Sequence, residues 1–107
     1  MYIINIGLRT SARYGGPEAD IPVAVARRAV LNRLGEPTKD AVLVQSGSED
    51  TLVVVLPGRA GPAAVIELAL DMAQDCIAVL DYDGRGSLVG PYHEAWGEFN
   101  PAYFHTI

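Results

Sequence analysis

The side chains that could bind or transform a ligand are few in this sequence and lie far apart. Cys76, His93 and His105 are the soft or borderline metal ligands. Their spacing matches no compact zinc motif, and His93-Glu94 lacks the second histidine of a helical HExxH. Nothing in the sequence places a histidine beside Cys76, as an activated thiol nucleophile requires. The sequence therefore gives no support for a metal site or a catalytic site, and we expect no cofactor.

Two glycine-containing segments are similar to ligand-binding loops. Residues 81–86 (DYDGRG) match the start of an EF-hand, but the fifth position is an arginine and the twelfth is Tyr92 instead of an acid. A hairpin turn is therefore the better interpretation. Residues 58–61 (GRAG) precede a predicted helix, where an anion could bind beside Arg59. Against that site, Pro62 removes one N–H donor.

Acidic residues outnumber basic ones by 13 to 8, which gives a net charge of −5. This balance disfavours general nucleic-acid binding, because such binding depends on basic patches. Glu67, Asp71 and Asp75 recur at the spacing of one helix face, either as a solvated face or as a contact for a basic partner. Asp81 and Asp83 lie at a predicted turn that could extend the negative surface.

Aromatic residues gather at the C-terminus, where five of the eight lie in the last sixteen positions. Their spacing is too irregular for a strand, so we expect a mostly irregular tail over residues 92–107. These rings, Trp96 among them, either pack onto the domain or across a homodimer, or form exposed anchors for another protein. Tryptophan and tyrosine dominate the hot spots of protein interfaces.

The hydropathy pattern predicts the elements that must position these residues. Strands are expected over residues 2–8, 41–45, 51–56, 76–82 and 87–89. Helices are expected from Asp20, as N-cap, to about Leu34 and from Pro62 to about Gln74. The single cysteine excludes a disulfide framework.

This order of elements predicts an α+β fold of the ferredoxin-like split βαβ type, with both helices on one face and a C-terminal hairpin extension. We expect one domain over residues 1–91, with the tail packed on it or on a partner. No apolar run reaches the ~18 residues of a membrane span. Residues 1–20 show no signal-peptide pattern, so a cytoplasmic location is expected.

Three segments of the C-terminal third resemble small, uncharacterised phage or prophage proteins. These are residues 74–79 (QDCIAV), 86–91 (GSLVGP) and 96–101 (WGEFNP). Some small acidic phage proteins of this size inhibit bacterial defence systems, anti-CRISPR proteins among them. The resemblance implies a non-enzymatic binder that occludes a nucleic-acid or partner site on a larger host complex. It supplies no functional residues to carry over.

Two functional hypotheses follow. The first is a phage-derived inhibitor that binds a host protein or ribonucleoprotein complex, without direct contact to nucleic acid or membrane. Its predicted contact residues are Glu67, Asp71, Asp75, Asp81, Asp83 and Trp96. The second is a small dimeric regulatory domain that binds an anion or small molecule near Arg59.

Overall fold

Five antiparallel strands form one sheet in the computed structural model, which describes residues 2–46, 49–58, 60–81 and 83–106. The strands are β1 (Tyr2–Gly7), β2 (Val42–Ser46), β3 (Glu49–Leu56), β4 (Ile77–Leu80) and β5 (Gly86–Val89). Their order across the sheet is β2-β3-β1-β4-β5. The most apolar strands, β1 and β3, are therefore inside the sheet, and β2 and β5 form its edges.

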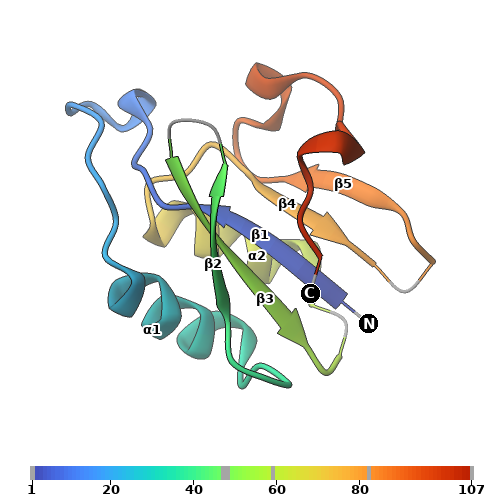
Figure 1. The fold of residues 1–107 in the computed structure, drawn as a ribbon. Helices are drawn as coiled ribbons and strands as arrows, with labels where there is room; N and C mark the ends of the chain where they lie inside the picture. Colours follow the sequence, from blue (N-terminus) through green and yellow to red (C-terminus); the bar gives the residue numbers. More distant parts are fainter. Residues whose placement is uncertain (1, 47–48, 59, 82, 107) are drawn as a thin grey trace.

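Both helices, α1 (Val23–Leu34) and α2 (Pro62–Asp71), lie on one face of the sheet (Figure 1). The main core lies between them and the strands, with Ile4, Leu52 and Leu68 fully buried in it. The continuous apolar run of β3 is buried along its length, because alternate residues face the helices and the opposite side. Neither helix in the described ranges has the length and hydropathy that crossing a membrane requires.

The predicted α+β class, with two helices and an antiparallel sheet, is confirmed. The ferredoxin-like order that we expected is not confirmed, because the order of the five strands differs from that of a four-stranded ferredoxin-like sheet. The reason is that β5 pairs with β4, from Ile77 opposite Val89 to Leu80 opposite Gly86. This pairing gives the sheet a fifth strand.

The start of α1 differs from the prediction. Asp20 pairs with Arg9 in an isolated β-bridge, and the N–H of Ile21 donates to the carbonyl of Leu8 over 2.9 Å. The chain is therefore extended at this point, and the helix begins at Val23. The prediction of Asp20 as the N-cap is wrong.

The end of α2 also differs, and this difference matters for the site. The helix ends at Asp71, and Ala73 then adopts a positive φ of 52°. The N–H of Gln74 turns back to the carbonyl of Ala69 over 2.8 Å. Asp75 therefore lies beyond the helix and does not continue its exposed face.

The C-terminal tail covers the face of the sheet opposite the helices (Figure 1). Phe104 packs against Ile3, Val53 and Val55. The side chain of Asn5 donates to the carbonyl of His105 over 3.0 Å and accepts the N–H of that residue over 2.9 Å. Two short 3-10 turns interrupt the otherwise irregular tail, η2 (His93–Trp96) and η3 (Pro101–Tyr103).

Candidate functional site

Two of the predicted acidic contact residues lie on α2 and form ion pairs with a residue of α1. Arg33 of α1 lies 2.9 Å from Glu67, through Nη1, and 2.6 Å from Asp71, through Nε. A second nitrogen of Arg33 completes a bidentate pair with Asp71. The hydrogen bond from Arg33 and the charge of its guanidinium hold the pKa of the Asp71 carboxyl below its ordinary value. Glu67 and Asp71 therefore link the helices instead of forming a free acidic surface.

The other predicted acids lie at opposite ends of β4. Asp75 precedes the strand and is only 8% exposed. Asp81 follows it and caps a turn, because its Oδ1 accepts the N–H groups of Asp83 over 3.0 Å and Arg85 over 3.2 Å. Asp83 is exposed in that turn. The predicted carboxylates do not come together on one surface.

Buried Asp75 instead joins three segments that are distant in the sequence. Its Oδ1 accepts the hydroxyl of Ser11 over 2.7 Å, and its Oδ2 accepts the indole N–H of Trp96 over 2.8 Å. Arg13 Nε lies 3.5 Å from the same Oδ2. Each carboxylate oxygen therefore has a polar partner, as a buried charge requires.

Backbone groups reinforce this Asp75 junction. Ser11 is the N-cap of the short 3-10 turn η1 (Ala12–Tyr14), and its backbone N–H donates to the carbonyl of Ala73 over 2.7 Å. The hydroxyl of Tyr14 donates to the carbonyl of Gln74 over 2.8 Å. The N–H of Tyr92 donates to the carbonyl of Asp75 over 3.0 Å. The tail is thus attached to the N-terminal loop through the connection between α2 and β4.

Gly90 lets the tail approach this connection. A Cβ at that position would overlap the carbonyl oxygen of Asp75 and the Cα of Cys76. Both are backbone atoms that cannot rotate away. The close approach therefore requires glycine at residue 90.

Four side chains form the surface above the junction, and we call them the aromatic–arginine cluster: Arg13, Tyr14, Tyr92 and Trp96. The rings of Tyr14 and Tyr92 meet edge to face with centroids 6.0 Å apart. The guanidinium carbon of Arg13 lies 5.5 Å from the Tyr92 centroid, within cation–π range. Trp96 is 64% exposed although its N–H is bound to Asp75. Of this cluster, only Trp96 was predicted from the sequence as a contact residue.

In the described part of the chain, Cys76, His93 and His105 do not form a catalytic site or a metal site. Burial, with a smaller effect from Asp75, raises the pKa of the Cys76 thiol to about 11. The thiol is therefore protonated near neutral pH and a poor nucleophile. His93 Nδ1 lies 3.6 Å from Glu94, whereas His105 lies in the tail over the sheet. Within the described ranges, no three His, Cys, Asp or Glu side chains gather as a metal site requires.

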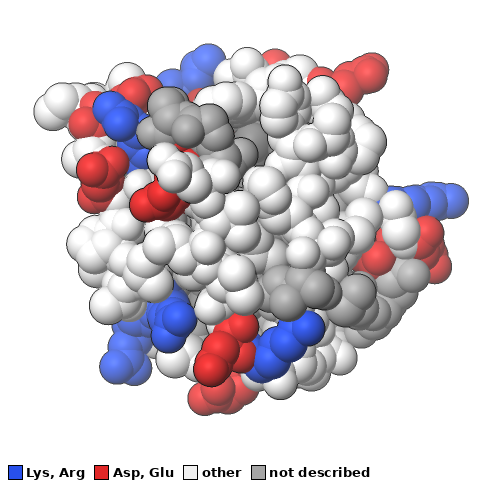
Figure 2. Space-filling model, viewed as in Figure 1, with Lys and Arg blue, Asp and Glu red and all other residues white. Residues whose placement is uncertain are grey.

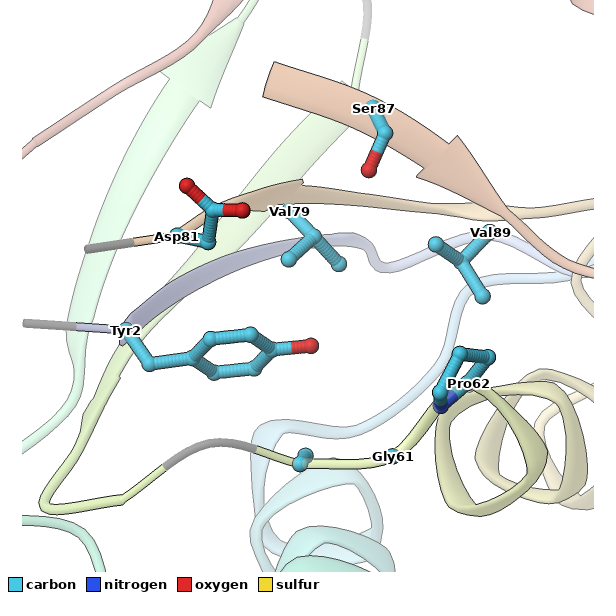
Figure 3. A pocket seen from close by; sticks show the side chains of 8 residues that line it. Tyr2, Gly61, Pro62, Val79, Asp81, Ser87 and Val89 are labelled. Atoms are coloured by element: carbon cyan, nitrogen blue, oxygen red, sulfur yellow. The ribbon is translucent and has the colours of Figure 1, made fainter. Parts of the chain in front are cut away.

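A pocket of about 410 Å³ lies where α2 begins beneath β4 and β5 (Figure 3). The ring of Tyr2 extends into it from β1, and Val79, Val89 and Pro62 form apolar walls. Ser87 and Asp81 contribute polar groups. The predicted anion ligand Arg59 lies outside the described residues.

Comparison of this chain with protein-family models, with curated proteins and with solved structures finds no match.

Proposed function

We propose that this protein binds another protein through the aromatic–arginine cluster. The observation that carries this proposal is the state of Trp96, which is 64% exposed while its indole N–H is bound to buried Asp75. A large ring held outward with its polar atom already satisfied offers apolar area for a partner to bury. Tryptophan, tyrosine and arginine are the residues most enriched among interface hot spots.

The hydrogen bonds below the cluster lower the entropic penalty of binding. Side chains that are free to rotate lose about 0.5–1.5 kcal/mol each when a partner immobilises them. Trp96 is already fixed by Asp75, and Tyr14 by the carbonyl of Gln74. Much of the ordering that binding requires has therefore occurred during folding.

Arg13 defines the chemistry of the partner. Its Nε faces Asp75, and no other described residue forms an ion pair or side-chain hydrogen bond with its guanidinium. Its terminal nitrogens can donate two parallel hydrogen bonds to a carboxylate. We therefore expect a partner segment that places an apolar side chain on Trp96 and an acidic group beside Arg13.

An inhibitor of a bacterial defence complex remains our hypothesis for the biological role. This role depends on the aromatic–arginine cluster, because Arg33 pairs with two of the predicted acidic contact residues and a third is buried. Glu67 and Asp71 would contribute little to steering a basic partner in this arrangement. Trp96 is the one predicted contact residue that stays in the proposal as a direct anchor.

For the fold, we propose that β1–β4 with both helices correspond to a split βαβ arrangement, to which β5 has been added. The position of β1 between β3 and β4 supports this proposal. So does the position of β3 between β1 and β2.

The test is partner capture from bacterial lysate followed by affinity measurement with matched variants. We expect Trp96→Ala to weaken binding of the captured protein by a factor of about 30 or more, as loss of a hot spot does. Tyr103→Ala is the control, because Tyr103 is an aromatic of the same tail, is 73% exposed and lies outside the cluster. Equal affinity for the Trp96 variant and the wild type would refute the proposal.

The pocket of Figure 3 supports a second candidate function, the binding of a small molecule. Its apolar walls with a few polar groups are typical of ligand sites. The measurement is the rise in melting temperature with nucleotides, amino acids or phosphate. We expect Ser87→Trp, which fills the pocket, to abolish any such rise. A rise that persists in this variant would place the ligand elsewhere.

A further inference from the structure

The edge strand β2 has an open side. It is hydrogen-bonded to β3 along one side, in an uninterrupted register from Val42 opposite Val53 to Ser46 opposite Glu49. In the described part of the chain, no strand lies on its other side. The backbone N–H and C=O groups on that side are therefore available to another strand.

This edge lacks the features by which proteins usually prevent strand addition. Its sequence, VLVQS, contains no charge and no proline, and its register with β3 contains no bulge. Leu43 is 51% exposed on the helix side, and Val42 is exposed on the opposite side. The other edge strand, β5, has no large exposed apolar side chain.

The net charges at the two ends of β2 differ in sign. Before the strand, Lys39 and Asp40 are both exposed, and Arg27 lies close enough to reach the carbonyl of Ala41 over 3.4 Å, so this end carries a net positive charge. At the other end, exposed Asp50 pairs in register with Gln45. Neither Lys39 nor Asp50 forms an ion pair with any described residue. Figure 2 looks onto the face of the sheet opposite the helices and shows uncharged side chains across its middle and charged ones at its rims.

We infer that β2 pairs antiparallel with β2 of a second copy of this chain, so that the two sheets become one. An antiparallel pair of identical strands is related by a two-fold axis and closes as a dimer. The axis brings Lys39 of one copy towards Asp50 of the other, twice per dimer. A parallel pair would instead place the two Asp50 carboxylates at the same end. The charge pattern therefore favours a second copy in the antiparallel orientation.

The inferred interface is small, because each copy contributes a strand of five residues and a few flanking side chains. Interfaces of this size are usually weak. We expect a reversible dimer whose population rises with protein concentration. This inference concerns a surface separate from the aromatic–arginine cluster, so either can fail without the other.

The test is sedimentation velocity from ~10 μM to ~1 mM, a range that covers weak association. We expect the wild type to shift from monomer to dimer and Leu43→Lys to remain monomeric. Leu70→Lys is the matched control, because Leu70 is 48% exposed on α2, away from the edge. We expect that variant to dimerise as the wild type does. A wild type that stays monomeric, or a Leu43→Lys variant that still dimerises, would overturn the inference.

A charge exchange tests the orientation, and it remains informative if Leu43→Lys does not fold. We expect Lys39→Glu and Asp50→Lys each to weaken dimerisation about tenfold at low salt, because each places like charges together. The double variant should regain wild-type affinity, since the exchanged charges again attract across the axis. A double variant weaker than both single variants would refute the antiparallel pairing.

Discussion

Trp96 donates its indole N–H to the buried carboxylate of Asp75 over 2.8 Å, although 21 residues separate them. The same carboxylate accepts the hydroxyl of Ser11, which is 64 residues away. One side chain therefore ties the N-terminal loop and the tail to the connection between α2 and β4. Stability and the shape of the aromatic–arginine cluster are coupled at this residue.

Substitution of Asp75 should produce a graded loss of stability. Asp75→Ala leaves Ser11 and Trp96 without their acceptor, and we expect a loss of about 1 to 3 kcal/mol in the free energy of unfolding. Asp75→Asn should lose less, because the amide oxygen can still accept from Trp96 while the amide nitrogen donates to Ser11. Urea denaturation monitored by Trp96 fluorescence measures the free energy of unfolding of both variants, since Trp96 is the only tryptophan in the sequence.

Asp40→Asn is the control for that series, because Asp40 is exposed and makes no ion pair or side-chain hydrogen bond in the described part of the chain. It should unfold as the wild type does. An Asp75→Ala variant as stable as this control would show that the junction contributes nothing to stability.

The attachment of the tail to the sheet should depend on Asn5. Its side-chain amide makes two hydrogen bonds with the backbone of His105, and Asn5→Ala removes both. We expect faster amide hydrogen exchange at His105 and in the preceding residues, while the amides of β1 and β3 stay protected. Asn32→Ala, at an exposed position of α1, should leave the exchange of the tail unchanged.

The class of fold was predictable because it follows from local hydrophobic periodicity. The apolar run of β3 predicted a strand inside the sheet, and Pro62 predicted the start of α2. The end of α2 was not predictable, since the acidic spacing continues through Asp75 while the backbone turns at Ala73. Asp75 instead has long-range partners, Ser11 and Trp96, which no local pattern indicates.

The candidate site was only partly predictable, for a related reason. Trp96 was identified from its residue type. Ser11 and Arg13, which contact the same Asp75 carboxylate, and Tyr14, which binds Gln74, lie about 80 positions earlier in the sequence. No local pattern marks these residues as neighbours of the tail. Likewise, the pairing of Arg33 with Asp71 was not predicted, because it depends on how the helices pack.

Close packing between Gly86 and Phe99 gives a further test of the tail. A Cβ at Gly86 would overlap the Phe99 ring. We expect Gly86→Ala to lower the free energy of unfolding by about 1 to 3 kcal/mol, as overpacking does. In a Phe99→Ala background, the same substitution should have little effect, because the overlapping ring is gone. Thermal denaturation of the four proteins forms a double-mutant cycle. Additive effects would contradict the contact.

The reactivity of Cys76 should be low at neutral pH. Burial raises the pKa of its thiol to about 11, so the reactive thiolate is scarce in the folded protein. We expect slow alkylation by iodoacetamide at pH 8 in buffer and fast alkylation in urea. Because the folded pKa is above the unfolded one, the associated stability is present below about pH 9 and is lost as the pH rises through about 11. Equal rates in buffer and urea would contradict this environment.

Glu49 should destabilise the fold in a pH-dependent way. Burial raises the pKa of its carboxyl above the ordinary value, and the charge of Arg9 only partly opposes this effect. Protonation is therefore more favourable in the folded state, and the associated stability is present at low pH and lost as the pH rises through the folded pKa. We expect Glu49→Gln to raise the melting temperature at pH 7, where it removes a half-buried charge. The gain should shrink towards pH 3, because the wild-type carboxyl is then protonated in both states.

Glu36→Gln, at an exposed position, should change the melting temperature little at either pH. A gain at Glu49 that is the same at pH 7 and pH 3 would show that burial of the charge is not its cause.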